Sequence, residues 1–142
     1  MKYIFLDIDG VLNSSNNKKL IDGVVDENKY LLLKKLINQT NAKVIIISSR
    51  RLYIEDRNQL LNIFDDIYDK VSFISFKLLS KYRKDEINLF LKDNIVSSFV
   101  ILDDIDDNYT KDEFINKHFI HVDGVTGLNE LNIEKAIEIL NK

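Results

Sequence analysis

Short apolar runs alternate with longer amphipathic stretches along this chain, and this alternation restricts its fold more than any other feature. The runs are rich in β-branched residues and almost continuously apolar, as is typical of strands that are buried on both faces of a parallel sheet. Strands that alternate with helices in this way predict an α/β fold of three layers. The five runs are Tyr3–Ile8, Val44–Ile47, Val71–Phe76, Phe99–Leu102 and Phe119–Val122.

Apolar residues at helical spacing occupy the stretches between and after these runs. Asp26 is a suitable N-cap for the first helix, because an aspartate side chain can accept a hydrogen bond from the first turn. The chain shows no internal repeat and no linker, so we expect a single domain over residues 1–142. The residues expected to face the core are Leu32, Leu33, Leu36 and Ile37, then Ile54, Leu60, Leu61 and Phe64, then Ile87, Phe90, Leu91 and Ile95, and finally Leu131, Ala136, Ile137 and Leu140.

Composition excludes several classes of site and partner. With 45% hydrophobic residues in 142, the chain can bury a real core. A net charge of −3 gives no electrostatic case for general affinity to nucleic acid or membranes. Without cysteine there are no disulfides or thiolate metal sites, and two histidines make a His-rich zinc site improbable. No N-terminal apolar stretch is long enough for a signal peptide or a membrane span, so we expect a soluble, cytoplasmic protein.

Polar residues gather directly after the expected strands. In open α/β sheets, ligands bind beyond the carboxyl ends of the strands, so these residues are the candidates for a functional site. The residues are Asp7, Asp9 and Gly10 after the first run, Ser48, Ser49, Arg50 and Arg51 after the second, Lys81, Arg83 and Lys84 before the third helix, and Asp103, Asp104, Asp106 and Asp107 after the fourth run.

Carboxylates that meet at one sheet edge repel each other and need a cation, or one of them must take up a proton. Ligands that are all oxygen suit Mg²⁺, which also binds substrate phosphate. A carboxylate beside Mg²⁺ can attack phosphorus, and a second can move the proton. Simpler interpretations remain open: Asp9–Gly10 as a turn, Ser48 and Ser49 as helix caps, and Asp103–Asp104 as an acidic turn.

Four motifs resemble those of the haloacid dehalogenase (HAD) superfamily, in the same order. "LDIDGVLN" is similar to the first motif, the apolar run that ends in Ser48 to the second, "KYRKDEI" to the third and "VILDD" to the fourth. The pattern SSRR, then R-x-x-E-I, then ILDD, then "GVTGL" most resembles the small HAD domains associated with RNA-repair proteins. The resemblance implies a three-layer Rossmann-like fold with a mainly parallel five-stranded sheet.

The resemblance also implies roles for individual residues. Asp7 matches the nucleophile and a metal ligand. Asp9 matches the general acid/base, and its carbonyl would also bind the metal. Ser48, with Ser49 beside it, matches the phosphate-binding hydroxyl, and Asp104, with Asp103, matches the fourth-motif metal ligands. The third motif usually has lysine, whereas here Arg83 or Lys84 takes that place. Asp107 is a candidate second acid of the fourth motif.

Many members of the superfamily carry a cap domain, for which this chain has no room. One helix and one strand already occupy the stretch between Ser49 and Arg83, and the loop Ser14–Val25 is long enough only for a small flap. Uncapped members often act on large substrates such as nucleic-acid ends. Arg50 and Arg51 could contact such a substrate or could be surface charges.

These observations favour a Mg²⁺-dependent phosphatase that works through an aspartyl-phosphate on Asp7, with a nucleic-acid end such as a 3′-phosphate as the candidate substrate. A phosphatase of a small phosphorylated metabolite or nucleotide is the alternative substrate class. A non-catalytic phosphate-binding module is a second alternative. A receiver domain is a third, but receivers place the phosphorylated acid after a later strand than DxDG does here.

Overall fold

The computed structural model of the chain describes residues 1–17, 19–75 and 82–142. Phe76, the last residue of one expected strand, and the candidate site residue Lys81 lie outside the described residues. All the other residues singled out from the sequence as candidates for the site are described.

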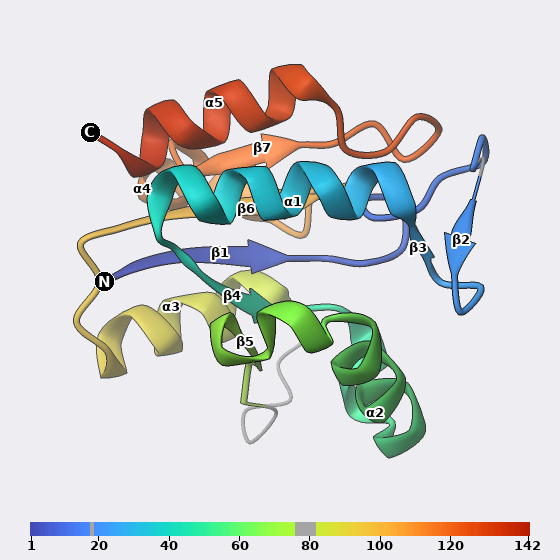
Figure 1. The fold of residues 1–142 in the computed structure, drawn as a ribbon. Coiled ribbons are helices and arrows are strands. Elements are labelled where there is room, and N and C mark those ends of the chain that lie inside the picture. The colour runs from blue at the N-terminus through green and yellow to red at the C-terminus, as the bar shows by residue number, and fades with distance from the viewer. Residues whose placement is uncertain (18, 76–81) are drawn as a thin grey trace.

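A five-stranded sheet in the order β5-β4-β1-β6-β7 forms the middle of the molecule (Figure 1). All neighbouring strands pair in parallel, with Phe5 opposite Ile45 on one side and Ile101 on the other. The predicted parallel sheet of five strands is confirmed. Its strands are β1 (Lys2–Leu6), β4 (Lys43–Ile46), β5 (Val71–Phe73), β6 (Ser98–Asp103) and β7 (Phe119–His121).

Helices cover both faces of this sheet (Figure 1). They are α1 (Glu27–Thr40), α2 (Ile54–Ile63), α3 (Arg83–Asp93), α4 (Glu113–Asn116) and α5 (Glu130–Leu140), with short 3-10 helices at η1 (Ser49–Leu52), η2 (Asp65–Lys70) and η3 (Tyr109–Lys111). Alternate strand residues point to opposite faces. Leu6 therefore lies in one apolar cluster with α1 and α5, and Phe5 lies in the other with α3.

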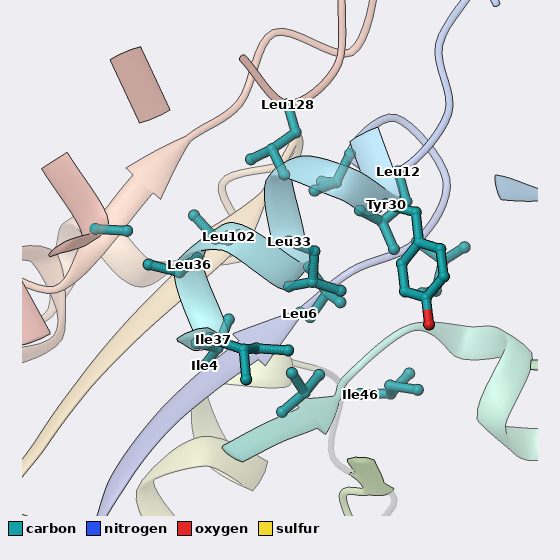
Figure 2. Close-up of a cluster of buried hydrophobic side chains, with 14 of the residues drawn as sticks. Ile4, Leu6, Leu12, Tyr30, Leu33, Leu36, Ile37, Ile46, Leu102 and Leu128 are labelled. Carbon is teal, nitrogen blue, oxygen red and sulfur yellow. The ribbon is translucent and has the colours of Figure 1, made fainter. Parts of the chain in front are cut away.

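The larger cluster lies between the sheet and α1 (Figure 2). Leu33 and Leu36 of α1 are fully buried there with Leu6 and Leu102. Asp26 caps this helix as predicted, since its Oδ1 accepts a hydrogen bond of 2.9 Å from the amide of Asn28. This packing fixes α1 on the sheet.

Four residues that we expected to face the core lie at the surface. Ile95 is 92% exposed because α3 ends at Asp93, so the helical spacing no longer applies to it. Leu131 lies on the outer side of α5, and Ile133, which the pattern did not single out, is buried in its place. Ile54 and Leu61 of α2 are also exposed.

The segment expected as a small flap contains a β-hairpin of β2 (Leu20–Ile21) and β3 (Val25–Asp26). Its turn has Asp22 and Gly23 in left-handed conformations, with φ of 51° and 72°, which is the requirement of a type I′ turn. Figure 1 shows this hairpin beyond the carboxyl end of β1. Among residues 1–17, 19–75 and 82–142, no cap domain covers the sheet edge, in agreement with the prediction of an uncapped fold.

The helices of the described residues include none with the length and apolar character that a membrane span requires.

Candidate active site

Three aspartates meet at the carboxyl end of the sheet. Asp7 follows β1, Asp103 ends β6 and Asp104 comes next. Because β1 and β6 are parallel neighbours, their ends lie together. One carboxylate oxygen from each aspartate lies within 4.8 Å of the other two. Asp7 and Asp103 are buried and Asp104 is half-buried, so the site combines concentrated negative charge with little water.

Gly10 makes room for the carboxylate of Asp104. Its backbone is left-handed, with φ of 83°, and a Cβ at this position would overlap the Asp104 side chain. Gly124 approaches the same carboxylate from the loop after β7, where a Cβ would lie 3.0 Å from Oδ2. Glycine at position 10 therefore meets two needs, the turn and the close approach.

Arg83 supplies positive charge to this cluster. Its Nη1 lies 3.3 Å from Asp7 Oδ2 and donates to Asp103 Oδ2 at 2.8 Å. The Tyr109 hydroxyl donates to the same Asp103 oxygen at 2.8 Å, and the amide of Ile105 donates to the other oxygen at 3.1 Å. Asp103 is thus fully engaged in holding Arg83 and its own loop. The partly buried Arg83 guanidinium stays charged, because the nearby carboxylates raise its pKa against the opposing effect of burial.

Of the two third-motif candidates, Arg83 is the one in contact with Asp7. Lys84 is the second residue of α3 and is half-buried. Asp107 accepts a hydrogen bond of 2.7 Å from the amide of Arg83. Asp107 therefore orders the start of α3 and is not one of the three clustered aspartates.

Burial and, less strongly, the charge of Asp103 and a hydrogen bond with Asp104 together raise the pKa of Asp7 from 3.8 to about 8, against the opposing charge of Arg83. Without a bound cation, the folded protein thus favours a protonated Asp7 near neutral pH. A cation at the cluster would favour the ionised form.

This raised pKa predicts how stability depends on pH in the absence of metal. Between about pH 4 and about pH 8 the folded state keeps a proton on Asp7 that the unfolded chain releases, so Asp7 makes the free energy of unfolding fall as pH rises through this range. Asp7→Asn should lack this contribution. We expect denaturant unfolding in chelator to show the variant gaining stability relative to wild type from pH 4 to pH 8. A difference in the free energy of unfolding between the two proteins that stays constant across this range would contradict the raised pKa of Asp7.

Asp9 lies apart from the three clustered aspartates, in a network of its own. Arg50 Nε donates to its Oδ2 at 2.8 Å, and Arg50 Nη2 donates to its Oδ1 at 2.9 Å. Asn13 Nδ2 donates to Oδ1 at 3.1 Å and to the carbonyl of Val24, in the hairpin, at 2.8 Å. The hydrogen bonds from Arg50 and, less strongly, from Asn13 lower the pKa of Asp9. The sequence did not single out Asn13, although it lies in the "LDIDGVLN" stretch.

Ser48 and Ser49 follow β4, which pairs with β1. Leu6 is opposite Ile46, so Ser48 lies just past the level of Asp7. Ser48 is buried, and its hydroxyl accepts a hydrogen bond of 3.2 Å from the amide of Arg50. It thus caps η1, and its own hydroxyl proton can still be donated. Ser49 is the exposed first residue of η1.

Arg51 is not a surface charge and does not face the open edge. It is buried with Glu86, and its Nη2 lies 2.6 Å from each Glu86 oxygen. Its Nη1 donates to the carbonyls of Ile47 at 2.9 Å and Ser48 at 3.0 Å. The pair fixes the loop after β4 to α3. The position of Glu86 next to the buried Ile87 was the only signal of it in the sequence.

The acidic cluster has a free position that suits a metal ion. Within the described structure, the buried Oδ1 of Asp104 has no hydrogen-bond partner, which is unusual for a buried polar atom. Oxygen-only ligands and an excess of negative charge suit Mg²⁺. Asp7 and Asp104 are therefore better placed as ligands than Asp103, whose two oxygens are already used.

A pocket adjoins Asp104. An open pocket is lined by Asp104 together with the loop that follows β7. His121 Nε2 lies 2.8 Å from the carbonyl oxygen of Asp104 and so links the end of β7 to the site. The other residues that line the pocket are His121, the last residue of β7, and Val122, Asp123 and Gly124 of the loop.

Comparison with known proteins agrees with this geometry. A search of curated proteins finds no match. A family model described as the HAD domain in Swiss Army Knife RNA repair proteins matches residues 3–133. The superfamily generally uses Mg²⁺, and membership supports a HAD-type phosphatase or a related function. The chain therefore belongs to the family of HAD domains found in Swiss Army Knife RNA repair proteins.

Proposed function

We propose that this protein is a Mg²⁺-dependent phosphatase that hydrolyses phosphomonoesters through an aspartyl-phosphate on Asp7. One observation carries the proposal: the buried Asp7 carboxylate at the open sheet edge lies 3.3 Å from Arg83 Nη1 and within 4.8 Å of a carboxylate oxygen of Asp104, whose buried Oδ1 has no partner among the described residues. A nucleophile, an anion-binding cation and a metal site thus adjoin one another. A carboxylate that only stabilised the fold would need the neighbouring cation but no adjacent metal site.

In the first step, a carboxylate oxygen of Asp7 attacks the phosphorus of the substrate. The bond between phosphorus and the leaving-group oxygen breaks, and the leaving oxygen takes a proton from Asp9. The products of this step are the free alcohol and a phosphorylated Asp7. In the free protein, the hydrogen bonds from Arg50 and Asn13 lower the pKa of Asp9, so Asp9 takes up this proton from solvent once Arg50 is released. The exposed position of Asp9 allows this exchange.

In the second step, water attacks the phosphorus of the aspartyl-phosphate. Asp9, now ionised, takes a proton from this water, and the bond between phosphorus and the Asp7 oxygen breaks. Inorganic phosphate leaves, Asp7 regains its carboxylate, and Asp9 regains its proton. No outside oxidant or co-substrate other than water is needed.

The chain supplies groups that bind the phosphoryl oxygens. Arg83 and the Ser48 hydroxyl are the proposed contacts, and Arg83 rather than Lys84 takes the third-motif role because it contacts Asp7. Asp7, Asp104 and the carbonyl of Asp9 would hold Mg²⁺. When bound, the ion would offset the charge of the carboxylates and of the phosphoryl group.

Two features support a nucleic-acid end, such as a 3′-phosphate, as the substrate. The family is described by its occurrence in RNA repair proteins, and the site has a small hairpin beside it and no cap domain. A small phosphorylated metabolite or nucleotide is the alternative substrate. The bidentate Arg50–Asp9 pair is the observation that favours a non-catalytic phosphate-binding module instead, since it occupies the proposed proton donor.

The purified protein should hydrolyse a generic aryl phosphate with Mg²⁺ and lose this activity in chelator, with recovery when Mg²⁺ is restored. Oligonucleotides with a 3′-phosphate should react about 10-fold faster or more, by kcat/KM, than sugar phosphates, since a single favourable charged contact is worth at least this factor. Activity that survives the chelator would contradict the proposed dependence on Mg²⁺. An equal or reversed substrate preference would remove the nucleic-acid assignment.

A further inference from the structure

The carboxylate of Asp9 accepts three hydrogen bonds. Arg50 contacts both of its oxygens and Asn13 contacts one, at 2.8 to 3.1 Å. A carboxylate held in this way acts only as an acceptor. Arg50 donates to both oxygens, so a leaving oxygen that contacts Asp9 competes with Arg50 at either one. Because Asn13 also bonds the hairpin and Arg50 does not, Arg50 is the partner that can leave.

The Arg50–Asp9 contact lies at the surface. The side chains of Arg50 and Asp9 are 27% and 56% exposed. A bidentate pair is stronger than an ordinary exposed ion pair, so a competing anion has to offer the guanidinium the same two hydrogen bonds to take Arg50 away. The planar guanidinium binds a phosphate group with the same two-pronged geometry that it uses for a carboxylate. A phosphate group is therefore the natural replacement for Asp9.

The position of Asp9 indicates which part of a substrate would contact Arg50. As the proton donor, Asp9 contacts the leaving-group oxygen, and Arg50 lies within hydrogen-bond distance of Asp9. Arg50 is thus on the side where the remainder of the substrate extends. In an oligonucleotide with a terminal phosphate, the next anion on that side is the adjoining phosphodiester, whereas an aryl phosphate has no charge there.

The surface beside Arg50 suits a nucleobase. The three residues Leu52, Tyr53 and Ile54 are all exposed, and Tyr53 is 64% exposed. The amide of Tyr53 donates to the carbonyl of Arg50 at 3.2 Å, so the two residues belong to one turn. An exposed aromatic ring next to a phosphate-binding cation is a common arrangement for single-stranded nucleic acid.

We propose that Arg50 is an exchangeable latch, which holds Asp9 in the free protein and transfers to the phosphodiester that adjoins the terminal phosphate of an oligonucleotide. The inference rests on the proposed phosphatase function and names its substrate class as chains with a second, charged phosphate. Transfer of Arg50 has two effects: it binds the substrate, and it frees Asp9 to contact the leaving oxygen. A substrate with the charged linkage should therefore have a higher kcat as well as a lower KM.

The test compares two dinucleotides that both carry a 3′-phosphate. One has the natural phosphodiester, and the other has an uncharged methylphosphonate linkage with the same bases. Wild type should prefer the charged linkage by about 10-fold or more in kcat/KM, with part of the difference in kcat. Arg50→Ala should react with both at rates within about twofold, and Arg50→Lys, which keeps the charge without the fork, should fall between.

Lys92→Ala is the matched control, because it removes an exposed cation from the last turn of α3; it should keep the preference of wild type. The latch is overturned if Arg50→Ala keeps the preference, if wild type has none, or if the preference lies in KM alone, which would make Arg50 a simple binding contact. If wild type hydrolyses neither dinucleotide nor an aryl phosphate, the phosphatase function itself fails. Should Arg50→Ala not fold by thermal melting, Arg50→Lys decides the test.

Discussion

Asp7→Asn protein is expected to hydrolyse an aryl phosphate at least about 10³-fold more slowly than wild type, the scale of loss when a catalytic nucleophile is removed. Asparagine has the size of aspartate and keeps the hydrogen-bonding shape of the site, but its neutral amide does not attack phosphorus. The measurement is steady-state hydrolysis with saturating Mg²⁺. The loss should appear in kcat, because the groups that bind phosphate, Arg83 and Ser48, are still present.

Two comparisons separate this effect from misfolding. Asp93→Asn makes the same chemical change at an exposed position at the end of α3 and should leave turnover unchanged. Thermal melting of Asp7→Asn should show a folded protein, because asparagine has the shape of aspartate and puts no ionisable group at this buried position. Turnover near the wild-type rate in a folded Asp7→Asn protein would remove Asp7 as the nucleophile.

Glu86→Ala is expected to destabilise the fold by about 3–5 kcal/mol, the usual effect of leaving one partner of a buried ion pair uncompensated. The change leaves the Arg51 guanidinium buried with only the carbonyls of Ile47 and Ser48 as partners. Urea unfolding measures the loss. Because this pair holds the loop that carries Ser48, the phosphatase activity of the folded fraction should fall as well.

The control for this prediction is Glu134→Ala, an exposed glutamate of α5, which should change stability by no more than about 0.5 kcal/mol. A variant with both members replaced by apolar residues, Arg51→Met with Glu86→Leu, should recover most of the stability, since neither charge is then buried alone. A Glu86→Ala protein as stable as Glu134→Ala would show that the pair is not a support of the loop.

The sheet could be predicted because its strands are buried on both faces. Strands of this kind read as continuous apolar runs, and Val44–Ile47 and Phe99–Leu102 fell on β4 and β6 with shifts of one residue at their ends. The placement of Asp7, Asp103 and Asp104 followed from the same fact. Once the strands are parallel, residues after different strands meet at one edge, although they are about a hundred positions apart in the chain.

The contacts of Arg50 and Arg51 could not be predicted. The two residues are adjacent in "SSRR", yet one lies at the surface with Asp9 and the other is buried with Glu86. A turn of 3-10 helix sends neighbouring side chains in different directions, and nothing in the local pattern says which goes where. For the same reason, the sequence could not show which of Arg83 and Lys84 contacts Asp7, because this depends on how α3 is rotated at its first turn.

The turn of the hairpin could have been predicted from the sequence. Asp22–Gly23 between short apolar pairs is a strong signal for a type I′ turn, but strands as short as β2 and β3 have too few residues to show an alternating pattern. The exposed Ile95 shows where helical spacing fails to predict burial. Spacing predicts a helical face only as far as the helix continues, and the end of α3 at Asp93 has no glycine or proline to mark it.

Trapping the phosphorylated enzyme tests the central claim, that Asp7 accepts the phosphoryl group, most directly. Wild-type protein is mixed with Mg²⁺ and substrate, quenched in acid during turnover and treated with borohydride, which reduces an aspartyl-phosphate to homoserine. Peptide mass spectrometry should then find homoserine at position 7, and only when substrate was present. Aspartate unchanged at position 7 during active turnover, or homoserine at position 9, 103 or 104, would contradict the account.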